Sequence, residues 1–260
     1  MSVTGPLGDV LAIALGVLTG ALSGAFGVGG AVISTPGVRL LGASTFVAVG
    51  TTLPSILPGA VAGTIRYHRD RLVDWRVVAG AAPAGVVAAV VGSLLSHVVP
   101  GEGHWLMVLT AVIIGITALR MAATPDEDRD GGDPPRRSGM VVAGVGTGAG
   151  LLSGLLGLGG GMVLIPAFHQ VLRLPLKATV ATSLACVGIL AVPSTVTHAV
   201  LGDIDWRLAF LLAVGVVPGA RLGAWLSLRA SDRRLRLAVA GFLGLLAAVY
   251  GVSELVAALR

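Results

Sequence analysis

The 260-residue sequence contains few charged residues: Asp, Glu, Lys and Arg together make up 12% of it. Soluble domains carry about 25% charged residues, so this chain lacks the side chains that cover a water-exposed surface. Hydrophobic residues make up 55%. The composition therefore excludes an ordinary soluble domain and indicates a protein that crosses a membrane several times.

Cysteine is almost absent as well. The single cysteine, Cys186, excludes an internal disulfide and a cysteine metal cluster. The five histidines are scattered, with no HxxxH or HExxH pair, so the sequence predicts no bound metal and no cofactor. No basic patch is interleaved with aromatics, so we expect no nucleic-acid partner and interpret the net charge of +5 as a topology signal.

Acidic side chains are missing from the middle of every long apolar segment. The nearest ones, Asp9 and Glu254, lie close to segment ends. Proteins that move cations or protons usually place carboxylates along the pathway. This absence argues against a cation as the substrate of a membrane protein and is compatible with an anion.

What the sequence does contain is long apolar segments. A helix needs about 20 residues to cross ~30 Å of hydrocarbon. Segments of this length are predicted at 8–26, 45–66, 77–98, 104–123, 139–157, 177–201, 207–228 and 237–258, with shorter apolar pieces at 30–41 and 160–172. The first ten residues have no positively charged region, so we expect the first segment to be retained rather than cleaved as a signal peptide.

One sustained polar stretch, TPDEDRDGGDPPRRSG, separates two hydrophobic halves. Its Pro, Gly and mixed charge predict a solvated connector. We therefore divide the chain into a first transmembrane repeat (1–123), a polar cytoplasmic linker (124–138) and a second transmembrane repeat (139–260).

The two halves repeat the same residues in the same order. Gly16, Gly20 and Gly24 return as Gly146, Gly150 and Gly154; Gly27, Gly29, Gly30 and Pro36 return as Gly157, Gly159, Gly160 and Pro166; Thr51-Thr52-Leu53 returns as Thr182-Ser183-Leu184; Asp74-Trp75-Arg76 returns as Asp205-Trp206-Arg207. Two repeated hydrophobic halves are typical of transporters built on internal symmetry.

The distribution of Lys and Arg predicts how the halves are oriented. If the long segments simply zigzag, the basic residues outside the membrane divide ten against seven. If each glycine-broken region enters and returns on the same side, one face holds 14 of the 18 basic residues, in loops 66–76, 120–137, 173–177 and 229–236. We therefore predict an all-α, polytopic fold of two inverted repeats. Each repeat is a glycine-broken helical hairpin followed by three transmembrane helices, with both termini outside the cytoplasm.

The glycine clusters GVGG (27–30) and GLGGG (157–161) are the candidate site. They do not fit the dinucleotide motif GxGxxG, because Met162 stands where the third glycine belongs. Consecutive glycines destabilise a helix, by up to ~1 kcal/mol each. Unwound backbone inside a membrane marks a cavity, and the amides of the half-helix that follows favour an anion. Close helix packing through small residues is the alternative interpretation.

Small hydroxyl and thiol side chains on the second long helix of each half complete the predicted site. They either donate hydrogen bonds to an oxyanion, or bond back to their own helix or across to a neighbouring one. Arg221, inside a predicted helix, either faces the substrate or extends to the interface. The substrate-binding candidates are Gly29, Gly30, Thr51, Thr52, Ser55, Gly159, Gly160, Gly161, Thr182, Ser183, Cys186 and Arg221.

Two further features are weighed separately. The repeated Asp-Trp-Arg motif is interpreted as structural, because Asp suits a helix N-cap and Trp suits the membrane interface. His68 and His198 occupy corresponding helix ends, where a histidine either relays a proton or simply terminates the helix.

The paired G-x-G-G…P segments, the T-S/T-L stretch and the repeated D-W-R together resemble the sulfite exporter TauE/SafE family of membrane transporters. The resemblance covers nearly the whole chain. In the first half Ala31 replaces Gly161, and Pro54 and Pro58 are extra. The family implies transport of small sulfur-containing anions, such as sulfite or organosulfonates, and of organic acids. We therefore expect this chain to move a small sulfur oxyanion or organosulfonate across the cytoplasmic membrane by alternating access.

Other functions stay open at this point. Small organic carboxylates are an alternative substrate. A membrane-embedded enzyme would need a nucleophile–base pair or a metal set, and Ser194, Thr195 and His198 lack a supporting acid, so we predict no enzyme and no catalytic residues. A non-transporting partner subunit would leave the repeated breaks unexplained. The oligomeric state is not predicted.

Overall fold

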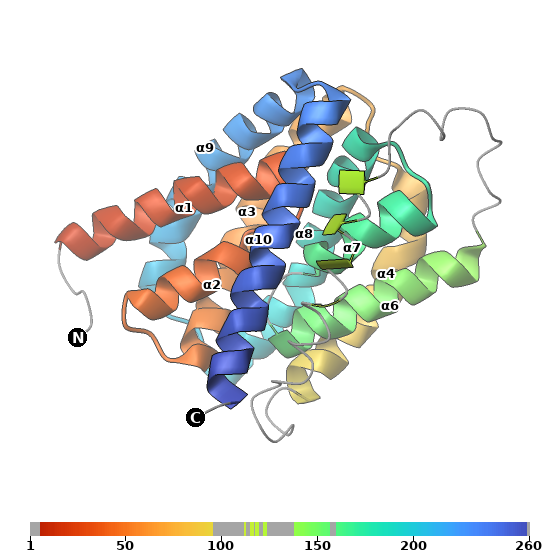
Figure 1. The fold of residues 1–260 in the computed structure, drawn as a ribbon. Coiled ribbons are helices and arrows are strands. Elements are labelled where there is room, and N and C mark those ends of the chain that lie inside the picture. The colour runs from red at the N-terminus through yellow and green to blue at the C-terminus, as the bar shows by residue number, and fades with distance from the viewer. Residues whose placement is uncertain are drawn as a thin grey trace.

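The computed structural model describes residues 6–95, 138–156 and 160–258, with a few positions between 112 and 123. These residues are helical and contain no strand (Figure 1). The helices are α1 (Pro6–Phe26), α2 (Ala31–Leu40), α3 (Thr45–Arg69), α4 (Trp75–Leu95), α6 (Gly139–Leu156), α7 (Gly161–Pro166), its π-helical continuation η2 (Ala167–Val171), α8 (Leu176–Leu201), α9 (Trp206–Arg229) and α10 (Asp232–Ala258).

Five of the described helices are long and apolar enough to cross a membrane: Pro6–Phe26, Val47–Arg69, Trp75–Leu95, Leu176–Leu201 and Trp206–Arg229. The prediction of an all-α, multi-pass membrane protein is confirmed. Most of the predicted segment 104–123 and nearly all of the linker 124–138 lie outside the described residues.

Two tight helix pairs join the halves of the chain: α1 packs along α9, and α4 packs along α6 (Figure 1). Glycines line both contacts, and a Cβ on any of them would overlap the backbone of the partner helix. They are Gly16, Gly20 and Gly24 in α1 and Gly146, Gly150 and Gly154 in α6. The prediction that these ladders serve close helix packing is confirmed.

The long helices α3 and α8 pack against each other in the middle of the bundle. α3 also packs on α9, and α8 packs on α4. The contacts of one half therefore recur in the other when α1, α3 and α4 are exchanged for α6, α8 and α9. The division into two repeats and their inverted orientation in the membrane both stay predictions.

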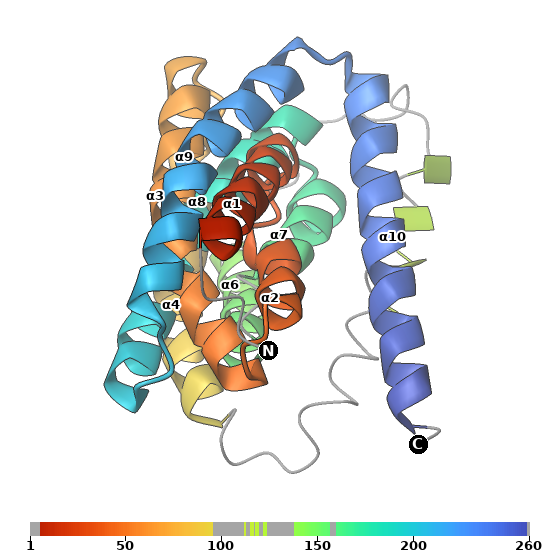
Figure 2. The same ribbon diagram turned by 90° about the vertical axis from the view of Figure 1, so that its left-hand side faces the viewer.

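Helix α10 stands along one side of the bundle (Figure 2). Its apolar side chains, including Val239 and Leu243, share a buried cluster with Val28 and Met162 from the two broken regions. The rings of Phe26 and Phe242 add a contact, with centroids 4.9 Å apart. This helix thus covers both glycine breaks from one side.

The aspartates of the repeated Asp-Trp-Arg motif begin α4 and α9. Asp74 Oδ1 accepts a hydrogen bond from the Val77 N–H (3.2 Å), and Asp205 Oδ1 accepts one from the Leu208 N–H (3.0 Å). The following tryptophans are exposed. The interpretation of these aspartates as helix N-caps is confirmed.

Candidate functional site

Glycine conformation interrupts the helices at the two predicted breaks. Residues 27–30 separate α1 from α2. Gly27 and Gly29 have φ values of 70° and 79°, and Gly160, which precedes α7, has 67°. Residues with a side chain rarely adopt this left-handed backbone conformation, so glycine is what permits the chain to turn at each break. The candidate Gly159 lies outside the described residues.

The two breaks touch each other. A Cβ at Gly161, the first residue of α7, would overlap the carbonyl oxygen of Val28 in the first break. The first break also rests on α8, where the Ser183 Oγ donates a hydrogen bond to the Gly27 carbonyl oxygen (2.9 Å). Segments far apart in the sequence therefore meet here.

The hydroxyl groups of α3 are engaged within this region. Thr52 Oγ1 lies 3.1 Å from Thr35 Oγ1 of α2, so one hydroxyl donates to the other. Ser55 Oγ donates to the Thr52 carbonyl oxygen (2.7 Å). Ser55 thus bonds back to its own helix, as the structural interpretation anticipates, while Thr52 connects α3 to the half-helix α2.

Thr51 and Thr182 form a matched pair of links between the halves. Thr51 Oγ1 accepts a hydrogen bond from the Asp205 N–H (2.9 Å), and Thr182 Oγ1 accepts one from the Asp74 N–H (3.0 Å). Each threonine is fully buried. These hydroxyls therefore hold the Asp-Trp-Arg turn of the opposite half, a role that their sequence positions do not reveal.

Two polar residues that sequence reasoning missed lie beside the breaks. Thr19 Cγ2 packs against Gly30, and Ser153 Cβ lies close to the position that a Cβ of Gly160 would take. Both side chains are at least 95% buried. Within the described part of the chain, neither Thr19 Oγ1 nor Ser153 Oγ has a hydrogen-bond partner. A buried hydroxyl without a partner costs about 1–3 kcal/mol, so each marks a position where a ligand could supply one.

The two remaining substrate-binding candidates, Cys186 and Arg221, lie in different environments. Cys186 is fully buried in the core cluster with Leu53 and Ala60. Arg221 is exposed on α9, on a face away from the buried glycines that pack on α1. The structure therefore does not bring Arg221 to the breaks, and its position suits an arginine that reaches the interface.

The two histidines have different surroundings. His68 is exposed, and its Nδ1 accepts a hydrogen bond from Trp75 Nε1 (3.2 Å). His198 is 1% exposed, and its Nδ1 lies 3.0 Å from Asp203 Oδ2. Of these two, only His198 combines burial with a carboxylate partner. The expectation that His198 has no supporting acid is therefore wrong. Ser194 Oγ and Thr195 Oγ1 instead donate to carbonyl oxygens of their own helix, at 3.3 and 2.7 Å.

The candidate hydroxyl side chains on α3 and α8 are buried from solvent. The candidate hydroxyls Thr51, Thr52, Ser55, Thr182 and Ser183 are at most 1% exposed. Within the described ranges, no three His, Cys, Asp or Glu side chains gather in a way that could hold a metal ion. The available chemistry is hydrogen bonding from hydroxyls and backbone amides.

The family model described as "Sulfite exporter TauE/SafE" matches residues 12–250. The chain is similar to "Probable membrane transporter protein YunE" of Bacillus subtilis, with 26% identity over 239 residues that cover 83% of this chain and 87% of that protein. It is also similar to a "Probable membrane transporter protein" of Xylella fastidiosa, with 28% identity over 246 residues that cover 93% and 94% of the two chains. No solved structure matches the chain. The resemblance inferred from the motifs is confirmed, and the relatives are named as transporters, which agrees with the prediction of a non-enzyme.

Proposed function

Since this chain belongs to the sulfite exporter TauE/SafE family, we propose that it transports a small sulfur-containing anion, sulfite or an organosulfonate, across the cytoplasmic membrane. It is a multi-pass membrane transporter of the TauE/SafE type, which implies a small-molecule substrate and a lipid environment. The nature of the substrate and the mechanism are inferred from the residues at the two breaks.

The observation that carries the proposal is the pair of buried, unpartnered hydroxyls at the breaks. Thr19 belongs to the first half and Ser153 to the second, and each stands beside the glycine that precedes a half-helix, Gly30 and Gly160. An oxyanion has several acceptor oxygens, which suits it to accept hydrogen bonds from hydroxyls of this kind. Backbone amides at the start of the two half-helices would add donors without adding charge.

The repeated architecture supports alternating access. The link from Thr51 to the Asp205 amide and the link from Thr182 to the Asp74 amide join opposite halves of the chain. In the inverted arrangement they lie toward opposite membrane faces. We infer that each link closes one side, and that the substrate passes when one opens while the other holds.

His198 is the better placed histidine for coupling to protons. His198 lies in the last turn of α8, and its side chain is buried where it contacts the partly buried Asp203. Protonation would turn this hydrogen bond into an ion pair, which gives the transporter a group that responds to pH.

Ligand binding to purified protein tests the proposal. A ligand that binds only the folded state raises its stability by about 2.7 kcal/mol at 100 times its Kd. We expect sulfite, thiosulfate or 2-hydroxyethanesulfonate to raise the thermal midpoint of the wild type, and Ser153→Ala to reduce that shift. Thr64→Val is the matched control, because Thr64 Oγ1 is also buried without a partner but lies about three helical turns along α3 from Thr52.

Three outcomes separate the possibilities. A sulfur anion that stabilises the wild type and Thr64→Val but not Ser153→Ala supports the site. Stabilisation by acetate or succinate but by no sulfur anion would indicate that the substrate is a carboxylate. Equal stabilisation of Ser153→Ala and Thr64→Val would show that the anion does not bind at the second break.

A further inference from the structure

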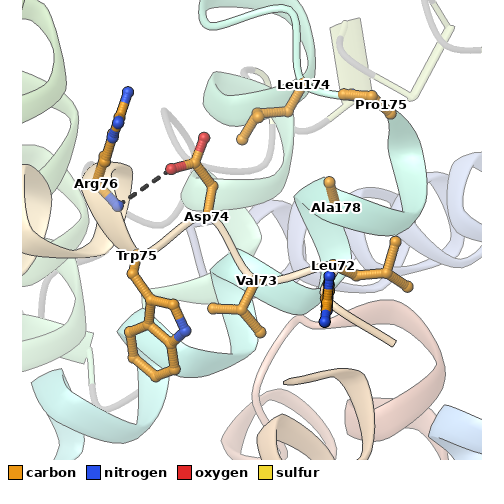
Figure 3. Close-up of a pocket in the computed structure, with 9 residues that line it drawn as sticks. Leu72, Val73, Asp74, Trp75, Arg76, Leu174, Pro175 and Ala178 are labelled. Atoms are coloured by element: carbon orange, nitrogen blue, oxygen red, sulfur yellow. Dashed lines mark hydrogen bonds between the residues drawn. The ribbon is translucent and has the colours of Figure 1, made fainter. Parts of the chain in front are cut away.

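A pocket of about 540 Å³ opens where the α3–α4 turn meets the start of α8 (Figure 3). Its walls are residues 71–76 on one side and Leu174, Pro175 and Ala178 on the other. The volume is within the ~300–1,000 Å³ typical of small-molecule sites. Both walls come from loops that the distribution of basic residues assigns to the cytoplasmic face.

Two arginines, Arg71 and Arg76, line this pocket. Within the described part of the chain, neither guanidinium group forms an ion pair, whereas the neighbouring Arg66 binds Asp70 at 2.8 Å. The one carboxylate of the pocket, that of Asp74, caps α4 by accepting from the N–H groups at its start, which holds it at that helix end (Figure 3).

The equivalent turn in the other half has neither an arginine at the position of Arg71 nor an arginine without an ion pair at the position of Arg76. Arg71 has φ 56°, and its counterpart 131 positions later in the repeat is Gly202, with φ 79°. An arginine is uncommon in this left-handed conformation and glycine is not, so the charged side chain is kept at a backbone cost. The counterpart of Arg76 is Arg207, whose Nη2 donates to both carboxylate oxygens of Asp9 (2.8 and 2.9 Å).

The pocket adjoins the proposed transport site. The Asp74 N–H at the pocket wall donates to Thr182 Oγ1, and the adjacent Ser183 binds the carbonyl oxygen of Gly27 in the first break. The pocket wall is therefore hydrogen-bonded to α8 at the residue that precedes the serine in contact with the first break.

We propose that this pocket is a capture site for the transported oxyanion, which Arg71 and Arg76 hold before it passes Thr182. The inference rests on the proposed function and adds a second, exposed site on one face only. Guanidinium groups bind sulfonate or sulfite oxygens through paired N–H donors, and their charge raises the local concentration of anions. The pocket thereby favours loading from its own side of the membrane.

Thiol labelling tests the pocket without requiring transport. In a Cys186→Ser background, which has no other cysteine, Ala178→Cys places a thiol in the pocket, and Val47→Cys places one at the equivalent position of α3. We expect Ala178→Cys to react faster with an anionic than with a cationic methanethiosulfonate reagent. The double variant Arg71→Gly/Arg76→Gln should lower this rate ratio about tenfold or more, because two unit charges act at close range. The glycine suits the backbone conformation, so the turn is kept.

The charge control is Arg233→Gln/Arg234→Gln, which removes two exposed arginines from the same predicted face but outside the pocket. The proposal expects this double variant to leave the rate ratio unchanged, Val47→Cys to show no preference for the anionic reagent, and 2-hydroxyethanesulfonate to slow labelling at Ala178→Cys. If both double variants lower the rate ratio equally, the preference for the anionic reagent comes from the general surface potential of this face. That result would overturn the proposal.

Transport from each side completes the test. In oriented proteoliposomes, Arg71→Gly/Arg76→Gln should raise KM about tenfold for substrate on the pocket side, with kcat and the opposite-side KM unchanged. An effect seen only in vesicles containing phosphatidylglycerol, and not in phosphatidylcholine, would assign the pocket to a lipid headgroup instead. If the wild type moves none of the anions, the proposed function fails, while the labelling result still decides whether the pocket binds them.

Discussion

Single Gly→Ala substitutions in α6 should show whether its glycines are needed for direct contact with the α4 backbone. A Cβ at Gly150 would overlap the carbonyl oxygen of Gly85 on α4, whereas a Cβ at Gly148 on the same helix meets nothing within 4 Å. Both Gly→Ala changes gain helix propensity, about 0.8–1 kcal/mol. That gain cancels in the comparison of the two variants.

The difference between these variants is then the cost of moving α4 away. Overpacking a close contact costs about 1–3 kcal/mol. We expect Gly148→Ala to be as stable as the wild type or up to ~1 kcal/mol more stable, and Gly150→Ala to be about 1–3 kcal/mol less stable than Gly148→Ala. Thermal unfolding of the detergent-purified proteins, followed by intrinsic fluorescence, measures the difference. Equal midpoints for Gly148→Ala and Gly150→Ala would refute the direct backbone contact between α4 and α6.

Three more results are expected. Thr182→Val should cost about 1–3 kcal/mol of stability, because the Asp74 N–H loses its acceptor; Thr182→Ser should restore it, and equal midpoints for Thr182→Val and wild type would remove the link. His198→Gln should flatten the dependence of transport on pH between 5 and 8, and an unchanged pH profile would exclude this histidine from coupling. A reporter fused at Gly101 should lie outside the cytoplasm, and a cytoplasmic reporter would contradict the inverted topology.

The sequence predicted the helices well because hydrophobic length and glycine spacing are local properties. Helix α3 continues through Pro54 and Pro58, which matches the predicted segment 45–66, since helices in membranes tolerate proline when neighbours satisfy the freed backbone groups. The spacing of four between the glycines of α1 and α6 predicts close helix packing, and their contacts agree.

The roles of individual polar residues were harder to predict. The sequence predicts Thr51 as a substrate ligand, but its partner in the structure is the Asp205 amide, 154 positions away, and no local pattern identifies such a partner. No sequence pattern singles out Ser153, because what distinguishes it is a buried hydroxyl without a partner beside Gly160 among the described residues. The depth of Arg221 in its apolar segment makes it a candidate ligand, yet the side of α9 on which it lies depends on how that helix packs on α1.

The most direct test of the central claim is flux through the purified protein. In proteoliposomes, the wild type should exchange ³⁵S-labelled sulfite or a labelled organosulfonate in a saturable manner without ATP. The double variant Thr19→Val/Ser153→Ala, which removes the two unpartnered hydroxyls at the breaks, should keep its fold and lose most of this exchange. Exchange by the double variant at the wild-type rate would contradict the claim that the two glycine breaks form the anion site.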